Sequence, residues 1–458
     1  MSAAQEKMRR EGLPSAAVET FAHYERLLRG GEQGMLSEDE LEPLEEPAKA
    51  DELPAGDDEA LDRVVVLKLN GGLGTSMGIT RAKSLLEAKE GMSFLDIIVR
   101  QVLHLRRRSG ARIPLVLMNS FATREDTMAT LERYPELPVD VPLDFMQGRV
   151  PKLLADSLGP VDWPDDPALE WAPPGHGDVY TALAGSGMLS ELLDHGYQYL
   201  FLSNSDNLGA VLEPRILDWF AREELPFVSE VTERTQGDRK GGHLARRPGG
   251  GLVLREIAQT PEEDIEAFQD ISRHRYFNCN TIWVDLRVLK RTLEERDGVL
   301  GLPMIVNRKT VDPTDPSSPE VIQLETAMGA AIDVFEGAAA LLVPRARFVP
   351  VKTTNDLLAL RSDAYVRAED CAVRLAAERR GQPPLVELDS EHYKLLRDFE
   401  ARFFAGPPSL VACDRLTVEG DVTFGRDVTV RGNVTIRGPR RIEDGSVLEG
   451  GDGSMLQG

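Results

Sequence analysis

The chain has 458 residues, enough for two or three domains that each bury a sizeable core. Its composition, 41% hydrophobic and 28% charged, is typical of a globular protein, and its apolar runs are too short to span a membrane. The formal net charge of −23 argues against nucleic acid as a partner, because binding a phosphate backbone requires a basic face. Three cysteines without CxxC spacing, and an N-terminus without an apolar leader, predict a reduced, cytoplasmic chain that has no structural zinc site.

Residues 1–60 form a polar N-terminal segment. Apolar residues recur at helical spacing from Ala16 to Leu28, which predicts a helix. Ser37, followed three residues later by Glu40, is typical of a capping box. The stretch from Glu38 to Glu59 holds eleven acidic residues against one lysine. Because such charge runs usually face solvent, we predict a solvated helix and linker here.

Residues 61–365 alternate between strand and helix patterns. This alternation predicts an α/β domain with a mostly parallel central sheet and helices on both faces. The predicted strands are 64–69, 113–118, 139–146, 199–203, 276–284 and 338–343, and the predicted helices are 94–108, 122–134 and 324–335. A Gly-rich turn inside 241–258 predicts a hairpin.

The C-terminal part changes its period. We expect a helical connection over 366–408 and a separate domain over 409–458. Four hexads beginning at Leu416, Val422, Val428 and Val434 repeat the pattern aliphatic-Thr-x with Gly, Asp or Asn at the corners. This period predicts a left-handed parallel β-helix. Because four hexads bury little core of their own, the piece must pack on the rest of the protein or on another chain, and its open edges suggest a homo-oligomer contact.

The first strand of the α/β domain runs into a glycine-rich loop that ends near Lys83. A strand followed by such a loop presents backbone N–H groups to phosphates, and Lys83 can reach back over it. An Asn-Gly hairpin turn is the alternative, but a hairpin needs only one or two glycines. The spacing matches neither a P-loop nor the Rossmann pattern G-x-G-x-x-G. The loop glycines are Gly71, Gly72, Gly74 and Gly78.

Three further residues stand where ligands are bound in open α/β sheets. Asp206 follows the predicted strand 199–203 and could bind Mg²⁺, or it could cap a following helix. His176 lies in a stiff Pro-Pro-Gly-His-Gly loop and could bond a phosphate or sugar hydroxyl, although a lone loop histidine is usually solvated. Lys352 precedes a helix that Thr353 or Thr354 could cap, a position where most lysines are surface charges.

The glycine loop LNGGLGTSMG with Lys83 resembles that of the eukaryotic-type UTP–glucose-1-phosphate uridylyltransferases (UDP-glucose pyrophosphorylases). The segments PPGHGD, NSDNLGA, KGG, EIAQ, FNCN, QLETAMGAA, PVKTTNDLL and VEGDVTFG follow in the order of that family. The resemblance covers the chain from about residue 62 and leaves the first sixty residues outside. It implies a Rossmann-like nucleotidyltransferase domain. Three departures are Arg81-Ala82 for Gly-Pro, His243 for Thr, and FNCNT with Cys279 for FNTNN.

The resemblance also implies a role for each matching residue. The nucleotide would contact the loop and three neighbouring segments, at Leu69, Asn70, Gly71, Gly72, Gln147, Gly175, Asn204 and Ser205, with Gln147 and Gly175 at the uracil. The sugar phosphate would contact His176, Gly242, Glu256, Asn278 and Asn280. Lys83 and Lys352 would neutralise the reacting phosphates, and Asp206 would bind Mg²⁺.

The reaction implied is attack of glucose 1-phosphate on the α-phosphorus of UTP. No general base is needed because the attacking phosphate is already ionised, so positioning and charge neutralisation carry the catalysis. His243 and Cys279 leave open a pyrophosphorylase for another or broader range of sugars, such as galactose or N-acetylhexosamine 1-phosphate. A non-catalytic UDP-sugar-binding protein on the same fold is a third possibility.

Overall fold

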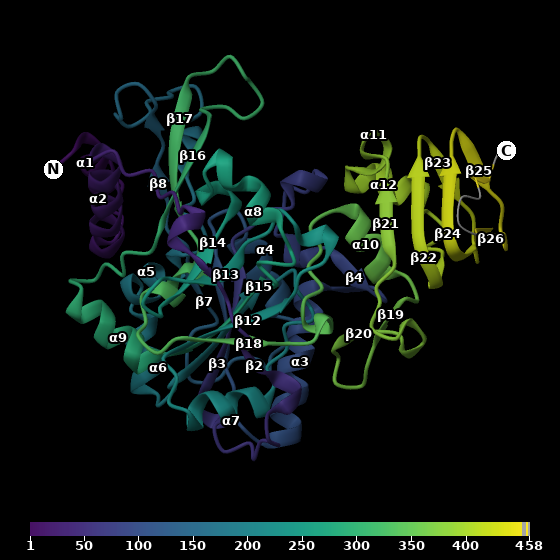
Figure 1. Ribbon diagram of the computed structural model, residues 1–458, viewed down its shortest axis with the longest axis horizontal. Helices are drawn as coiled ribbons and strands as arrows, with labels where there is room; N and C mark the ends of the chain where they lie inside the picture. The colour runs from purple at the N-terminus through teal and green to yellow at the C-terminus, as the bar shows by residue number, and fades with distance from the viewer. Residues whose placement is uncertain (451–454, 457–458) are drawn as a thin grey trace.

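The computed structural model describes residues 1–450 and the backbone of residues 455–456, so part of the expected C-terminal domain, 451–454 and 457–458, lies outside the described residues. A large mixed sheet fills the body, the two N-terminal helices lie at one side, and the C-terminal strands form a lobe at the opposite side (Figure 1). The predicted α/β architecture is confirmed. None of the helices over the described range has both the length and the hydropathy that a membrane crossing requires.

The main path of the central sheet runs in the order β2-β18-β12-β15-β11-β3-β6-β7. Neighbours are parallel except at β15, which is antiparallel to both β12 and β11. The sheet is therefore rich in parallel pairs, as predicted. Its strands are β2 (Ala48–Lys49), β18 (Ala339–Leu342), β12 (Phe227–Glu233), β15 (Tyr276–Asp285), β11 (Tyr199–Asn204), β3 (Val64–Asn70), β6 (Leu115–Asn119) and β7 (Asp144–Met146).

Alternate residues of the central strands serve two separate cores. Val64 and Val66 of β3 pack with α3, α7 and α10, whereas Val65 and Leu67 pack with α5, α6 and α9. A strand buried on both faces needs apolar residues at every position, which explains the continuous run at β3. The helices are α1 (Ala3–Arg10), α2 (Ser15–Arg29), α3 (Phe94–Ser109), α4 (Arg124–Leu131), α5 (Asp178–Gly185), α6 (Met188–Asp194), α7 (Pro214–Arg222), α8 (Ile265–Gln269), α9 (Leu286–Glu295), α10 (Thr354–Arg361), α11 (Ser390–Tyr393) and α12 (Leu396–Arg402).

One predicted helix, 324–335, is wrong. Its first residues belong to β17 (Glu320–Thr326), which pairs antiparallel with β16 (Met304–Thr310) in a projecting hairpin, and the rest is a 3-10 helix, Met328–Asp333. The 3-10 residues are almost all buried. A run that is apolar on every side has no periodicity to separate helix from strand. The predicted hairpin within 241–258 is confirmed, as β13 (His243–Arg246) and β14 (Leu252–Arg255).

The N-terminal segment is bound into the fold rather than solvated. Helices α1 and α2 share an apolar core with two short strands of separate sheets, β8 (Val150–Pro151) and β9 (Leu153–Leu154). Further on, β1 (Glu42–Pro43) pairs with β13, and β2 pairs with β18. The Ser37 capping box is confirmed, but the neighbouring Glu38 is buried, because cationic side chains of the main domain surround its carboxylate.

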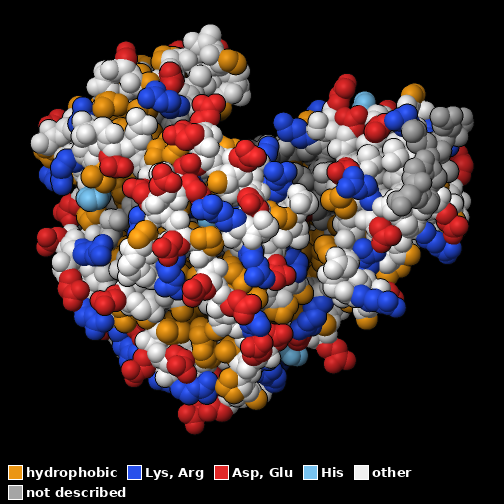
Figure 2. Space-filling model, in the orientation of Figure 1, with side chains coloured by type: hydrophobic (Ala, Val, Ile, Leu, Met, Phe, Trp, Pro, Cys, Tyr) orange, Lys and Arg blue, Asp and Glu red, His pale blue; other side chains and the backbone are white. Residues whose placement is uncertain are grey.

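The C-terminal lobe is a stack of parallel strands. Leu416 pairs with Val434, and Thr429 pairs with Val447, in each case 18 residues later. The lobe shares one apolar core with α3 and α10, so the predicted packing on the rest of the protein is confirmed. An indentation separates its outer part from the body (Figure 2). The strands are β21 (Leu385–Leu388), β22 (Ser409–Glu419), β23 (Val422–Phe424), β24 (Thr429–Arg437), β25 (Arg440–Ile442) and β26 (Val447–Gly450).

The predicted helical connection over 366–408 is only partly helical. It contains α11 and α12, but it also contains β20 (Val373–Leu375) and β21. Strand β21 pairs parallel with β22, so the stack of parallel strands begins before residue 409. The hexad pattern that marks the later strands is not repeated in β21, which is why the sequence did not reveal it.

Candidate active site

Four parallel strands end together at one edge of the central sheet. Asn70 of β3 pairs with Asn119 of β6, Asn119 pairs with Met146 of β7, and Asn204 of β11 pairs with Leu69. The residues that follow these strands therefore lie side by side, although they come from four distant parts of the sequence. The carboxyl edge of an open parallel sheet is where such folds bind their ligands. The residues next in sequence are Gly71, Ser120, Gln147 and Ser205.

The glycine loop has space for a ligand because two of its positions have no side chain. A Cβ on Gly71 would lie 2.3 Å from Oε1 of Gln147, so a side chain at this position would push the Gln147 amide out of its place. A Cβ on Gly72 would meet no atom of the described residues within 4 Å, so this part of the loop faces open space. The Ser120 hydroxyl donates to the Gly71 carbonyl at 2.8 Å and fixes the turn.

Gln147 and Gly175, both predicted at the uracil, are brought together. Nε2 of Gln147 donates to the Gly175 carbonyl at 3.4 Å. Gly175 has φ +78°, and a Cβ there would lie 2.4 Å from the carbonyl oxygen of Thr326 in β17. The mis-predicted region at β17 is thus part of the site, since it supports the loop that carries Gly175 and His176.

Leu69 and Asn70 support the loop from below. The Asn70 side chain is buried and donates to Asn119 at 2.7 Å and to Thr127 at 2.9 Å. The Leu69 carbonyl accepts from the Ser205 N–H at 3.2 Å, which joins β3 to the Asp206 loop. Because these side chains point into the protein, the two residues can offer a nucleotide only their backbone.

Lys83 and Asp206 form an ion pair in the middle of this edge. Nζ of Lys83 lies 2.6 Å from Oδ2 of Asp206. The other oxygen, Oδ1, is buried and has no hydrogen-bond partner among the described residues, and such a free carboxylate oxygen suits a hard cation such as Mg²⁺. The alternative that Asp206 caps a helix is excluded, because the next helix, α7, begins at Pro214 with Glu213 as its N-cap. Since no cluster of three or more potential ligand residues occurs within the described ranges, a cation here would complete its shell with phosphate oxygens and water.

His176 has a defined tautomer. The backbone N–H of Met328 donates to Nδ1 at 2.9 Å, so the neutral ring carries its proton on Nε2. Burial lowers the pKa of His176 to about 4, which keeps the ring neutral near pH 7. The side chain is therefore a neutral hydrogen-bond donor rather than a cation.

Asp178 was missed by the sequence analysis. Its Oδ2 accepts the N–H of Gly148 at 2.6 Å and so joins the His176 loop to the Gln147 loop. Burial raises the pKa of Asp178 to about 6, with the Gly148 hydrogen bond opposing the shift. An acidic residue at the first turn of a helix usually indicates only a favourable helix start, so its sequence position gave no signal for this role.

The residues predicted at the sugar also converge. A Cβ on Gly242 would lie 2.6 Å from Oε1 of Glu256, so these two residues face each other across the hairpin. The Asn278 N–H donates to the Gly242 carbonyl at 3.0 Å, and Nδ2 of Asn278 donates to Oδ1 of Asn280 at 3.0 Å. Burial raises the pKa of Glu256 to about 7, and the positive charge of Lys352 opposes this rise.

Asn207 connects the Asp206 loop to the segment that carries Lys352, another role missed from the sequence. Nδ2 of Asn207 donates to the Arg347 carbonyl at 3.1 Å, and its Oδ1 accepts from the Val349 N–H at 2.9 Å. The Val351 N–H in turn donates to the Asp206 carbonyl at 3.2 Å. These two partners of Asn207 lie about 140 residues later, which is why the motif NSDNLGA alone did not reveal the contact.

The family model described as UTP–glucose-1-phosphate uridylyltransferase matches residues 18–431. The chain belongs to this family. The uridylyltransferase of Hordeum vulgare is 42% identical over 397 residues, which cover 86% of this chain and 82% of that protein. That of Saccharomyces cerevisiae is 42% identical over 368 residues, which cover 80% and 72% respectively. A mutant UDP-glucose pyrophosphorylase of Leishmania major, solved with UDP-glucose, is 46% identical with a TM-score of 0.94 and covers 99% of this chain and 98% of that chain.

This uridylyltransferase family match begins at residue 18, so the expectation that the first sixty residues lie outside the resemblance is wrong. Two of the departures from the family pattern lie behind the sugar residues. The ring of His243 is fully buried and stacks on His274 with centroids 4.0 Å apart, and the Cys279 thiol is buried on the opposite side of β15 from Asn278 and Asn280. The side chains of His243 and Cys279 therefore point away from the residues predicted at the sugar.

Proposed function

We propose that this chain transfers the uridylyl group of UTP to glucose 1-phosphate, giving UDP-glucose and pyrophosphate. The observation that carries this conclusion is the convergence of the family's loops at one sheet edge, in a chain that matches the family model over residues 18–431. The Gly71–Gly72 loop, Gln147 and Asp206 come from separate segments that end at this edge, and the Lys352 segment is hydrogen-bonded to the Asp206 loop through Val351; these contacts support the proposal.

In the proposed reaction, a phosphate oxygen of glucose 1-phosphate forms a bond to the α-phosphorus of UTP. The bond from that phosphorus to the bridging oxygen breaks, and pyrophosphate leaves with the electron pair. The barrier is the approach of two anions, so cations and fixed dipoles aimed at the phosphates lower it. We assign this work to Lys83, whose ammonium lies at the centre of the edge, and to Lys352.

The remaining residues bind and orient the two substrates. Gln147 and the Gly175 backbone would bind the uracil, while the Gly71–Gly72 loop and residues Asn204 and Ser205 would hold the nucleotide. Nε2–H of His176 would donate to the sugar phosphate, since its Nδ1 is already used. Glucose hydroxyls would meet the converging polar groups of Gly242, Glu256, Asn278 and Asn280.

Asp206 would hold Mg²⁺ through Oδ1, for which the described part of the chain supplies no hydrogen-bond partner. When bound there, the ion would offset negative charge on the phosphates of the nucleotide. Lys83 already contacts the second oxygen of the same carboxylate, so the ammonium would act on the same phosphates as a cation held by Asp206.

Pyrophosphate release from the purified chain tests the proposal. We expect release that requires UTP, glucose 1-phosphate and Mg²⁺ together, with each omitted in turn as a control. Galactose 1-phosphate and N-acetylglucosamine 1-phosphate test the broader-sugar alternative, which would give comparable release. UTP binding without release by the folded chain would favour the non-catalytic alternative and contradict turnover.

We propose four parts for the chain: the N-terminal segment 1–60, the catalytic domain 61–365, the connection 366–408 and the C-terminal domain 409–458. For the last we propose a left-handed parallel β-helix, supported by pairing at 18 residues, the length of three hexads. Val447 on β26 is 53% exposed and would lie in a homo-oligomer contact. Light scattering should then show a larger species that Val447→Asp dissociates, and a monomer at all concentrations would refute the contact.

A further inference from the structure

A strap of the N-terminal segment, residues 36–43, lies against the hairpin β13–β14. Glu42 pairs with Arg246 and Pro43 with Ala245, so the strap adds a short strand to the edge of β13 that does not pair with β14. The Leu36 N–H donates to the Gln259 carbonyl at 2.7 Å, just beyond Glu256. The apolar side chains Leu36, Leu41, Ala245 and Val253 close this contact. The strap therefore contacts the hairpin from β13 to beyond the end of β14.

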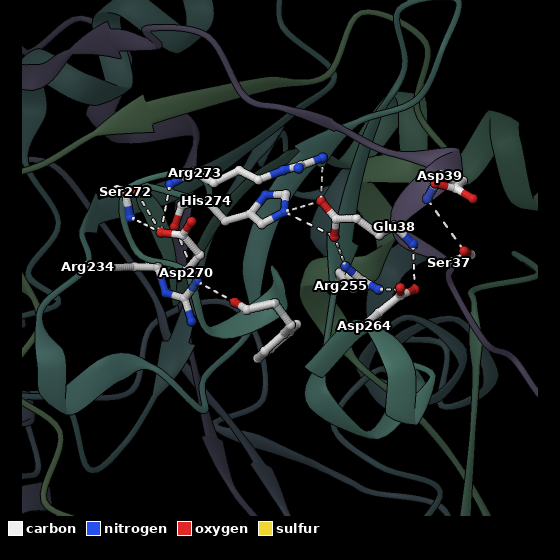
Figure 3. Close-up of polar contacts among 11 residues, drawn as sticks. Ser37, Glu38, Asp39, Arg234, Arg255, Asp264, Asp270, Ser272, Arg273 and His274 are labelled. Atoms are coloured by element: carbon white, nitrogen blue, oxygen red, sulfur yellow. Dashed lines mark hydrogen bonds and ion pairs between the residues drawn. The ribbon is translucent and has the colours of Figure 1, made fainter. Parts of the chain in front are cut away.

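At the centre of this contact is the carboxylate of Glu38, which meets three cationic or titratable groups (Figure 3). It lies 2.5 Å from Arg255, 2.8 Å from Arg273 and 3.0 Å from Nε2 of His274. The Glu38 N–H also donates to Asp264 at 2.7 Å, and Asp264 lies 3.2 Å from Arg255. The strap is thus connected to the hairpin by charge as well as by backbone.

Arg255 transmits this contact to the proposed sugar residues. Its side chain is 0% exposed, and Glu38 and Asp264 are its ion-pair partners. Arg255 directly precedes Glu256 and pairs with His243, which directly follows Gly242. Because successive side chains of a strand point to opposite faces, Arg255 and His243 lie on the back of the hairpin whose front carries Gly242 and Glu256.

His274 gives a second connection to the same strand pair. Its ring, bonded to Glu38 through Nε2, stacks on the ring of His243 with centroids 4.0 Å apart. Both rings are fully buried. A shift of the Glu38 carboxylate would therefore displace both His243 and Arg255, which pair with each other, and with them their sequence neighbours Gly242 and Glu256.

We propose that Glu38 is a positioning residue for the sugar-phosphate side of the site. Without the Glu38 carboxylate, the buried guanidinium of Arg255 keeps only Asp264, at 3.2 Å, as a counter-charge, so Arg255 would shift towards Asp264 or recruit water. That movement displaces Glu256 and Gly242, whereas Gln147 and the glycine loop keep their own supports. This inference deepens the proposed function and rests on it, because it takes Gly242 and Glu256 as glucose contacts.

The test compares Michaelis constants in Glu38→Gln and Glu38→Ala variants of the full chain. We expect the KM for glucose 1-phosphate to rise roughly tenfold or more, as for other small displacements of binding groups, while the KM for UTP changes less than about twofold. The alanine variant should show the larger effect. Asp39→Asn is the matched control, because it removes one acidic charge from the same turn at an exposed position and should change neither constant.

A purely structural role for Glu38 predicts a different result. A partly unfolded preparation loses active molecules, which lowers the apparent kcat and leaves both KM values unchanged. That outcome, or an equal rise of both KM values, would overturn the proposal. If the Glu38 variants do not fold, Arg273→Gln provides the test, since Arg273 is 45% exposed and contacts the same carboxylate. A smaller rise confined to glucose 1-phosphate is expected, and no change would count against the inference.

Failure of the inference and failure of the proposed function are distinguishable. If the unaltered chain does not release pyrophosphate from UTP and glucose 1-phosphate, the function fails. If it does, and the Glu38 variants retain a normal KM for glucose 1-phosphate, only the inference fails.

Discussion

The two sides of the site are supported in different ways. The nucleotide side consists of loops at the ends of neighbouring parallel strands, whose residues are buried on both faces, so its supports lie within the sheet itself. The sugar side rests on an antiparallel hairpin off the main sheet path, and the strap residue Glu38 contacts it from 217 residues earlier in the chain. The nucleotide side should therefore tolerate substitutions outside the domain core, whereas the sugar side should depend on charged residues that are distant in sequence, such as Glu38.

Asn207 and the segment 347–352 join the two sides, and we call these residues the seam. The Lys352 segment reaches Glu256 on the sugar side electrostatically and reaches the Asp206 loop through Asn207 and Val351. Substitutions at the seam should affect the chemical step itself, while those away from it should affect one substrate or only the stability of the fold.

The largest effect is expected for Lys352→Ala. Over the described part of the chain the Lys352 ammonium has no hydrogen-bond or ion-pair partner, so its loss should leave the free energy of unfolding within about 0.5 kcal/mol. Loss of a cation at the reacting phosphates should lower kcat by roughly a hundredfold or more. Steady-state kinetics beside urea unfolding provide the measurement, with the exposed Lys290→Ala as control. Near-normal turnover would remove Lys352 from the mechanism.

Asn207→Ala should break the seam itself. The variant loses hydrogen bonds to Arg347, Gly209 and Val349 and leaves buried backbone groups unsatisfied, a cost of about 1–3 kcal/mol. Because the Asp206 loop and the Lys352 segment would then be joined only by the Val351 backbone hydrogen bond, kcat should fall roughly tenfold, with smaller changes in both KM values. Asn433→Ala, exposed in the C-terminal lobe, is the control. If stability falls and kcat per folded molecule does not, the seam has no catalytic role.

On the nucleotide side, the buried Lys68 should make the stability of the fold depend on pH. This lysine of β3 is fully buried, and burial lowers its pKa to about 7, with Arg347 adding to the shift and Glu230 opposing it. Between about pH 7 and 10.5 the unfolded chain holds more protons at this site than the folded chain, so stability should rise with pH across that interval. Urea midpoints measured from pH 6 to 9.5 should lose this rise in Lys68→Met. An unchanged slope would mean that Lys68 is charged in the fold.

On the sugar side, Glu256 should give a smaller pH dependence of stability, with the opposite sign. Its carboxyl pKa, raised to about 7 from 4.5, means that the folded chain holds the extra proton between those values. Stability should therefore fall as the pH rises from about 4.5 to 7. Glu256→Gln should be more stable than the unaltered chain at pH 8 and equally stable at pH 4, as measured by thermal unfolding at both values. Equal stability at pH 8 would contradict the buried position of the carboxyl group.

The sequence predicted the nucleotide side more completely than the sugar side, for a physical reason. The apolar run at β3 reflects burial of the strand on both faces, and the loop glycines reflect positions where a Cβ would be in the way. Both are local requirements that a short segment shows by itself. The proximity of Gln147 to Gly175 and of Gly242 to Glu256 was inferred from family order, and the structure brings both pairs together. The helix predicted over 324–335 failed because a fully buried run has no polar face to show its period.

By itself, the sequence determined the α/β class, the family and the set of loops that meet at the sheet edge, because strand burial, glycine geometry and motif order are properties of short segments. Only the tertiary structure decided which partners those segments meet. It placed Glu38 in a buried ion cluster instead of in solvent, gave His176 its tautomer, and joined Asp206 to Lys352 through Asn207. The sequence around a charged group or an amide does not identify its partner, because the partner is determined only when distant parts of the chain pack together.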